Sequence, residues 1–270
     1  MPNPTPAKRE RRSAVSLDLG VKRRLSRRND PARESAQADF ERQRLGVLER
    51  DNWTCRGCGF ASKRMHGAPA GGMEVHHLDD DHHNNHPANL ATLCPLCHMT
   101  FTLGRRGYRF DARLIYAPTI EQWQLNMIHH VVWGLERALA LMDAGDEAAA
   151  GWRDEALPEG FRAGVASASD TLMRIEKAGA ERLKSQMSET LPQIEDAETL
   201  YGALQNLPPA YYQTRDQLIR PIRLMPIRDR FTGRLDRWAR GVWLASYPPR
   251  TWRSIVESVE RLERESGRPS

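Results

Sequence analysis

The chain has 270 residues, 40% of them apolar and 28% charged, and this composition excludes a disordered or collagen-like protein. We expect a globular chain with one large domain or two small ones. The most hydrophobic stretch, residues 128–142, is interrupted by histidines and charged residues, so we expect no membrane span. No apolar stretch follows the charged N-terminus, so we expect a cytoplasmic protein without a secretory signal peptide. The four cysteines then need a role other than disulfide bonds.

Positive charge is concentrated at the two ends of the sequence. Residues 1–33 and residues 215–253 each hold ten Lys or Arg against three acidic residues, while the residues between them carry a net negative charge. Clustered cations match a polyanion, so the pattern indicates binding of nucleic acid, with DNA as the expected partner. A solvated basic tail explains the N-terminal cluster equally well, and docking of the ends onto an acidic protein is a third interpretation.

The sequence begins with a segment that has few apolar residues. Residues 1–32 hold three prolines among the first six positions, followed by two runs of Lys and Arg, and we predict a flexible basic arm. From Arg33 to Asp51 the pattern becomes helical, with Phe40, Val47 and Leu48 among charged residues. This predicts a charged helix with one apolar side.

Two cysteine pairs follow this helix. Cys55 and Cys58 form one C-x-x-C motif, and Cys94 and Cys97 form a second. Paired C-x-x-C motifs a few dozen residues apart are the spacing of a tetrathiolate zinc site, whereas a redox dithiol would use only one pair. The residues around them include too few contiguous apolar side chains for a core. We therefore predict a structural Zn²⁺ that stabilises a module over residues 53–103, with about 10–16 kcal/mol of apparent binding energy.

Further candidate ligands lie between the cysteine pairs, in the sequence EVHHLDDDHHNNHPANL. Its first residues are typical of a strand end, where the adjacent His76 and His77 point in opposite directions. His98 directly follows the last cysteine in the first turn of a helix, so we expect it to point away from the zinc. His76 and His98 could therefore hold a second metal ion. We interpret the acidic residues and histidines of residues 79–86 as a solvated polar loop.

The next segment contains a predicted strand and a long helix. Residues 114–116 are typical of a short strand. Thr119 and Gln122 fit a capping box at the start of a helix that runs to Gly145, with Trp123 among its recurring apolar residues. The helix contains His129 and His130, which we interpret as part of its polar face because no cysteine or carboxylate lies at matching helical spacing.

The last part of the sequence is predicted to be mostly helical. Helices are expected over residues 167–187 and 196–206, and an Arg-rich part from 213 to 253 alternates arginines with aromatic and aliphatic residues. We expect these aromatic residues to fill a core while the arginines stay in water; the alternative is that they grip phosphates and stack on bases. The predicted division is a basic flexible arm (1–32), a zinc-binding domain (33–117), a long packing helix (118–145), a connector (146–165) and a helical Arg-rich region (166–270).

The cysteine-rich module resembles a known family. The order Cys-x-x-Cys, Val-His-His, Asn-Leu and Cys-x-x-Cys-His is similar to the motif of HNH endonucleases, whose fold is a ββα-metal finger, and its three letters fall on His77, Asn89 and His98. The resemblance implies that His77 is a general base and that Asn89 fixes the loop that orients it. It also implies that His76 and His98 hold a catalytic ion: Mn²⁺, Mg²⁺, Ni²⁺ or Zn²⁺. Many members carry another histidine where this sequence has Thr102.

The chemistry of phosphodiester hydrolysis accounts for these residue types. A neutral imidazole at His77 can accept the proton of the attacking water. An ion held only by His76 and His98 keeps open positions for the scissile phosphate and the leaving oxygen. The sequence therefore supports the hypothesis of a metal-dependent DNA endonuclease on an α+β fold, in which a four-cysteine, zinc-stabilised HNH finger precedes a mostly helical region.

A second resemblance extends further along the chain. The stretches RDNWTCRGCGF, NNHPANLATLCPLCHMTFT, LIYAPTIEQWQLN and IRLMPIRDRF are similar to the IcmJ (DotN) family of type IVB secretion and related conjugation systems, over about residues 40–142 and the late Arg-rich segment. This likeness implies a cytosolic subunit of the coupling complex that serves an inner-membrane transport ATPase, with the HNH-like fold as an adaptor. The two main hypotheses are therefore an endonuclease or DNA-handling subunit and a catalytically silent, zinc-stabilised adaptor. A third hypothesis is a zinc-finger regulator that binds DNA, but it gives the histidines no role.

Overall fold

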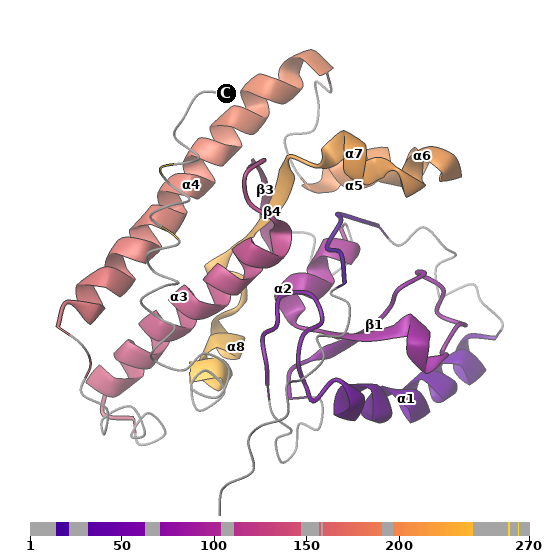
Figure 1. Ribbon diagram of the computed structural model, residues 1–270, viewed down its shortest axis with the longest axis horizontal. Helices are drawn as coiled ribbons and strands as arrows, with labels where there is room; N and C mark the ends of the chain where they lie inside the picture. The colour runs from indigo at the N-terminus through magenta and orange to yellow at the C-terminus, as the bar shows by residue number, and fades with distance from the viewer. Residues whose placement is uncertain are drawn as a thin grey trace, which may run out of the picture.

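Helices make up most of the described chain, and its strands form two separate two-stranded sheets (Figure 1). The computed structural model describes residues 15–21, 32–62, 71–103, 111–146, 157, 159–190, 197–239, 259 and 264. The α-helices are α1 (Arg33–Arg50), α2 (Pro95–His98), α3 (Gln122–Asp143), α4 (Phe161–Thr190), α5 (Ala197–Asn206), α6 (Pro209–Gln213), α7 (Arg215–Ile219) and α8 (Thr232–Arg237). The strands are β1 (Glu74–His77), β2 (Leu90–Leu93), β3 (Ala112–Tyr116) and β4 (Ile222–Pro226). This confirms the predicted mixed α+β class.

The first sheet belongs to the cysteine-rich module. β1 and β2 are antiparallel, with His77 opposite Leu90. β2 leads directly into α2, so the order in the chain is strand, strand, helix. α1 packs against both strands, and Arg50 at its C-terminus donates hydrogen bonds to the carbonyl oxygens of Pro87 (2.6 Å) and Leu90 (2.8 Å). The predicted charged helix thus exists and fixes the sheet from outside.

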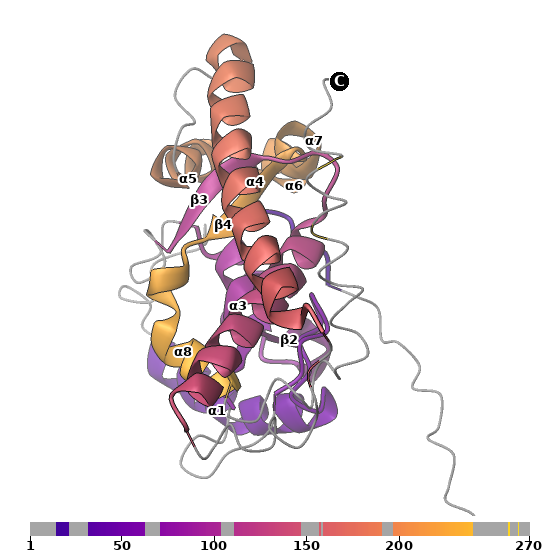
Figure 2. The ribbon, with the colours of Figure 1, turned by 90° about the vertical axis from the view of Figure 1, so that its left-hand side faces the viewer.

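The second sheet joins two segments that lie far apart in the sequence. β3 pairs antiparallel with β4, with Leu114 opposite Leu224. α4 packs across β3, and α3 packs against both β4 and α4 (Figure 2). The sequence predicts β3, whereas β4 lies in a segment that was expected to be helical. The pairing explains the difference, because a strand that closes a two-stranded sheet owes its conformation to its distant partner.

Two hydrophobic clusters hold these elements together. The smaller lies among α3, α4 and the second sheet, and the larger runs from the N-terminal segment through the cysteine-rich module to α3, β4 and α8. α3 contributes Leu125 and Ile128 to the smaller cluster and Val131 and Leu135 to the larger one. Because it is buried on two sides, α3 connects the cysteine-rich module to the rest of the chain.

Part of the predicted N-terminal arm is packed. Leu17, Leu19 and Val21 are buried, and the Tyr212 hydroxyl lies 2.9 Å from both the backbone nitrogen and the carbonyl oxygen of Val21. The Gly20 amide also donates to the module, to a backbone carbonyl in the turn after α2. A few alternating apolar residues are therefore enough to anchor this segment. Residues 1–14 and 22–31 of the predicted arm lie outside the described residues.

The long helix α3 begins later than predicted. The capping box is formed by Glu121 and Gln124, not by Thr119 and Gln122. Trp123 was expected among the recurring apolar residues of this helix but is 42% exposed, because the buried face at the start of α3 carries Gln122, Leu125 and Asn126. The C-terminus was predicted correctly: Gly145 has φ of 73°, a left-handed conformation that glycine adopts without strain and that ends the helix.

The next two helices follow the predicted order. α4 covers the predicted helix 167–187 but begins at Phe161, inside the segment predicted as a connector, and it reaches Thr190. α5 spans Ala197–Asn206, which confirms the predicted helix 196–206.

The packing of α4 on β3 gives a test of the fold. A Cβ added at Gly179 would lie 2.9 Å from the Cβ of Ile115 and 3.3 Å from the carbonyl oxygen of Tyr116, whereas a Cβ at Gly202 of α5 meets nothing within 4 Å. Both substitutions by alanine gain similar helix propensity. We expect Gly179→Ala to be less stable than Gly202→Ala by about 1–3 kcal/mol, the usual cost of overpacking, in chemical denaturation followed by circular dichroism. Equal stability of the two variants would contradict this packing.

Candidate metal centre

The four cysteines lie on two similar loops of the module. Cys55 and Cys58 lie in the turn between the bridged residues Thr54 and Ala61, and Cys94 and Cys97 lie where β2 passes into α2. In each pair the backbone N–H of the second cysteine points at the sulfur of the first, with N···S distances of 3.5 Å for Cys58 to Cys55 and 3.4 Å for Cys97 to Cys94. Both pairs therefore adopt the same turn, which directs their sulfurs toward one point.

The four sulfur atoms converge in the interior. They all lie within 4.8 Å of one another, and all four cysteines are free and buried. The Cys58 and Cys94 sulfurs are 3.7 Å apart, whereas a tetrahedral zinc with bonds of about 2.3 Å requires an edge of about 3.8 Å. A disulfide would need a separation of about 2 Å. The donor set and spacing therefore fit one structural metal ion such as zinc, as predicted.

Burial changes the pKa values of the clustered thiols. Burial and the neighbouring thiols raise the pKa of Cys94 well above its ordinary value, and burial does the same for the pKa of Cys97. Burial also acts to raise the pKa of Cys55, but hydrogen bonds from Cys58, Cys94 and Cys97 outweigh it and hold the pKa of Cys55 well below its ordinary value. Since the thiolate is the metal-binding form, binding of an ion releases protons from the cluster.

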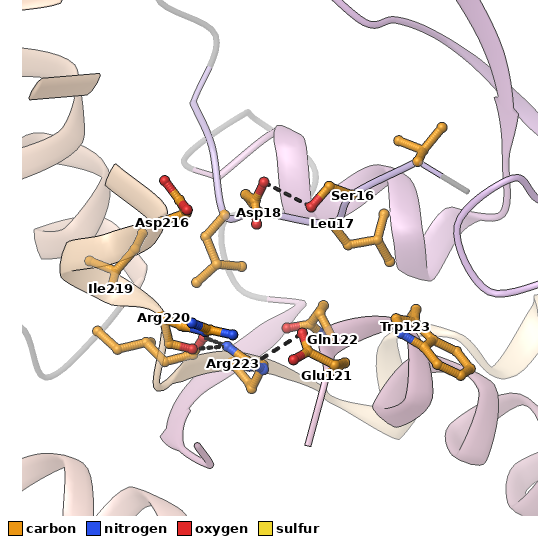
Figure 3. A pocket seen from close by; sticks show the side chains of 13 residues that line it. Ser16, Leu17, Asp18, Glu121, Gln122, Trp123, Asp216, Ile219, Arg220 and Arg223 are labelled. Atoms are coloured by element: carbon orange, nitrogen blue, oxygen red, sulfur yellow. Dashed lines mark hydrogen bonds and ion pairs between the residues drawn. The ribbon is translucent and has the colours of Figure 1, made fainter. Parts of the chain in front are cut away.

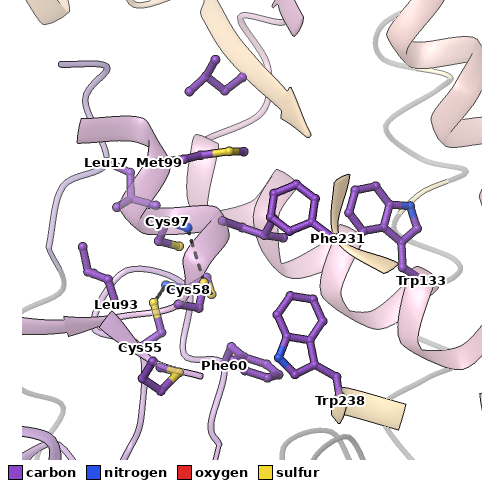
Figure 4. Packing of buried hydrophobic residues seen from close by; sticks show 14 of the residues in the cluster. Leu17, Cys55, Cys58, Phe60, Leu93, Cys97, Met99, Trp133, Phe231 and Trp238 are labelled. Carbon is purple, nitrogen blue, oxygen red and sulfur yellow. Dashed lines mark hydrogen bonds between the residues drawn. The ribbon is translucent and has the colours of Figure 1, made fainter. Parts of the chain in front are cut away.

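Helix α3 supplies two polar groups to the cluster that the sequence analysis missed. The Asn126 side-chain amide donates to the Cys97 sulfur at 3.3 Å, and His130 Nε2 lies 3.1 Å from the Cys94 sulfur. Figure 4 shows the cysteines beside Phe60, Phe231 and Trp238, which belong to the same hydrophobic cluster. The signal was present as polar residues four positions apart, Gln122, Asn126 and His130, in the first half of α3.

The prediction that His129 and His130 form a polar surface is wrong. Both are buried, at 1% and 0% exposure. Burial lowers the pKa of His129 to about 4 and the pKa of His130 to about 3, so both imidazoles are neutral near pH 7. The reason is the second packing face of α3: both sides of the helix are covered, so it leaves these positions no contact with water.

His76 and His98 lie next to each other in the structure. Their ring centroids are 5.4 Å apart in an edge-on arrangement, and both residues are buried. The His76 ring also stacks on Phe101 with centroids 4.4 Å apart, and His98 Nδ1 lies 2.6 Å from a carboxylate oxygen of Glu74. Among the described residues, the four cysteines are the group in which three or more His, Cys, Asp or Glu ligand atoms gather within 4.8 Å.

His77 and Asn89 lie on the other side of β1. His77 follows His76 on the strand, so its side chain points to the opposite face. There His77 Nε2 is 2.8 Å from the Asn85 side-chain oxygen. Asn89 donates to a carboxylate oxygen of Asp79 and to the carbonyl oxygen of Asn84, both at 2.8 Å, and accepts from the Asp79 amide. Asn89 thus holds the polar loop that carries Asn85. The contact between Asn85 and His77 is one that the sequence analysis did not identify.

A polar cavity of about 500 Å³ lies between the N-terminal segment, the start of α3 and the α7–β4 turn (Figure 3). Its lining includes Asp18, Glu121, Asp216 and Arg220. Arg223, only 6% exposed, donates to the carbonyl oxygen of Ile120 at 2.6 Å and to neighbouring carbonyls of its own segment. We interpret this cavity as a polar gap where the three segments meet, with no further role.

In the described part of the Arg-rich segment, the aromatic residues fill the core, as the sequence analysis expected. Phe231 and Trp238 are each 1% exposed. Two of its arginines serve the interior: Arg223 is buried, and Arg215 donates to the carbonyl oxygen of Leu19 at 2.7 Å. The expectation that the arginines stay in water is therefore wrong for Arg223, whose donors are taken up by backbone carbonyls. Residues 240–253 lie outside the described residues.

Comparison with known proteins gives one relative of assigned role. No family model matches the chain. The chain is a distant homologue of the type 4 apparatus protein DotN of Legionella pneumophila, with 32% identity over 97 residues. The match covers 35% of this chain and 42% of DotN, so the chain spans less than half the length of that relative. Among the helices of the described residues, none has the combination of length and hydropathy that a bilayer crossing requires.

Removal of one sulfur tests the metal centre. In Cys94→Ser the ion loses a ligand in a fully buried site, so we expect loss of the bound metal and a large drop in thermal stability, because structural zinc contributes on the order of 10 kcal/mol to folding in small zinc domains. Metal analysis and thermal denaturation measure both effects, with His83→Ala in the exposed loop as the control. An unchanged melting temperature and metal content in Cys94→Ser would contradict the site.

Proposed function

We propose that this protein is a metal-stabilised, catalytically silent adaptor subunit of a type IV secretion or conjugation apparatus. The observation that carries the proposal is the 32% identity with DotN over 97 residues. The buried four-cysteine cluster supports it, because it gives the chain a stable module without requiring any chemistry. In this role the chain works in the cytoplasm, associated with an inner-membrane complex, and binds the coupling ATPase or another adaptor protein.

Within this proposal the ion at the cysteines is Zn²⁺. Four thiolates with a spacing close to a tetrahedral edge suit zinc better than the oxygen-preferring Mg²⁺ or Mn²⁺. The proposed organisation follows the predicted division: a zinc-binding, HNH-like domain over residues 33–117, the long helix to 145, a connector that α4 shortens by starting at Phe161, and a C-terminal helical region. Residues 1–32 precede them as a basic arm, of which residues 15–21 pack against the module.

The contacts of the motif histidines support a structural role. Glu74 lies against His98 Nδ1, and Phe101 covers the face of His76. Thr102, where many HNH nucleases have another histidine, is fully buried and its hydroxyl donates to the carbonyl oxygen of His98 at 3.3 Å. These contacts occupy the neighbourhood in which a nuclease would hold its second ion.

A metal-dependent DNA endonuclease of the HNH type is the second candidate. The antiparallel β1–β2 pair followed by α2 has the strand–strand–helix order of a ββα-metal finger, and the His76 and His98 rings pack edge-on against each other. In that case these two histidines would hold a catalytic divalent ion, His77 would act as general base, and Asn89 would position its loop. The basic ends would then bind DNA.

Two assays on the purified full-length chain separate these candidates. The adaptor proposal predicts that the chain co-elutes with the purified coupling ATPase of its own host in size-exclusion chromatography. It also predicts that supercoiled plasmid stays intact when Mn²⁺, Mg²⁺ or Ni²⁺ is added, because an adaptor holds no catalytic ion at His76 and His98.

His77→Ala is the matched control for both assays. An adaptor should keep its co-elution in this variant. A nuclease should lose about 10²–10⁴-fold of its cutting rate, the usual contribution of a general base. Ion-dependent nicking that disappears in His77→Ala, together with no co-elution, would overturn the adaptor proposal. Duplex DNA binding that weakens steeply with salt would add support to the second candidate.

A further inference from the structure

One buried stripe of α3 is polar, although most buried residues of this helix are apolar. Gln122, Asn126 and His130 recur every four residues and therefore lie on one face. They are 3%, 0% and 0% exposed. Buried polar side chains are costly unless they are hydrogen-bonded, so the partners of this stripe indicate its purpose.

The first two residues link β4 to a cysteine. The Gln122 side chain accepts from the Leu224 amide at 2.8 Å and donates to the Leu224 carbonyl at 2.9 Å. It also donates to the Asn126 side-chain oxygen at 3.0 Å. This contact fixes the orientation of the Asn126 amide, so that its nitrogen faces the Cys97 sulfur at 3.3 Å. A continuous chain of hydrogen bonds therefore runs from β4 through α3 to the cysteine cluster.

The third residue of the stripe is held in place by aromatic rings. The His130 ring stacks on Phe60 with centroids 4.2 Å apart and planes 4° from parallel, and the Trp238 ring packs edge-on at 4.6 Å. Its Nε2 lies 3.1 Å from the Cys94 sulfur. A metal-bound thiolate has no proton to donate, so with an ion present His130 must carry its proton on Nε2 and donate it to that sulfur.

We propose that Asn126 and His130 are positioning residues of the metal centre, and that the bound ion latches α3 and β4 onto the cysteine-rich module. The ion fixes the four sulfurs in space as thiolates, which are strong acceptors, and the two donors of α3 bind them. Without the ion the sulfurs lose their thiolate charge and their fixed positions. We therefore expect α3 to loosen together with the cysteine-rich module. The inference rests on the structural metal of the proposed function and is independent of the apparatus partner.

The neighbouring His129 provides a matched control for this latch. It lies on the same helix, is 1% exposed and packs edge-on against Trp133, but its Nδ1 contacts the Leu125 carbonyl at 2.7 Å instead of a sulfur. His129→Phe and His130→Phe therefore remove equally buried imidazoles, and only the second removes a partner of the metal centre.

The first measurement is the rate of zinc transfer from the purified full-length chain to a chromogenic chelator. We expect His130→Phe and Asn126→Leu to release zinc about 10–100-fold faster than the unmodified chain, the usual effect of losing an outer hydrogen bond to a metal ligand. His129→Phe should stay within about threefold on the same scale. His130→Gln, which retains an N–H donor, should restore slow release. Equal release rates in His130→Phe and His129→Phe would overturn the proposal.

The second measurement is amide hydrogen exchange of the unmodified chain with zinc bound and after chelation. The latch predicts that chelation lowers protection in α3 and β4 as well as around the cysteines. Loss of protection confined to the cysteine-rich module would overturn it. Purified chain without any bound metal would instead remove the metal centre of the proposed function, and failure to co-elute with the coupling ATPase would leave the latch intact, so the outcomes are distinguishable.

Discussion

The structure depends on the gathering of four sulfur atoms at one buried point. Cys55 and Cys58 come from a turn and Cys94 and Cys97 from the junction of β2 and α2, and all four are nearly or fully excluded from water. Four packed thiols gain little from each other, whereas one tetrahedral ion satisfies them together. A structural ion bound there would hold together the short strands β1 and β2, at a position inside the larger hydrophobic cluster.

At this location the cysteine cluster is in contact with several segments of the chain. The N-terminal segment covers one side, where Leu17 lies so close to Gly57 that an added Cβ would be 3.0 Å from it. α3 covers another side with Asn126 and His130. A chain organised in this way suits the adaptor role that we propose.

The sequence predicts features that are set by neighbouring residues. The cysteine spacing, the charged helix α1, the strand β3 and the opposed directions of His76 and His77 follow from local patterns, and each is present. β4, the packed residues 15–21 and the role of His130 depend on contacts between distant segments. From the sequence alone, a histidine on the polar side of an amphipathic helix is expected to face water. Only the four-residue spacing of Gln122, Asn126 and His130 indicates that this side of α3 is also packed against other elements.

The most direct test of this account is X-ray absorption at the zinc edge on the purified, full-length protein. The account predicts one zinc per chain with a first shell of four sulfur atoms at about 2.3 Å and no nitrogen or oxygen ligand. A shell that contains histidine nitrogen, or a folded protein that contains no zinc, would contradict it.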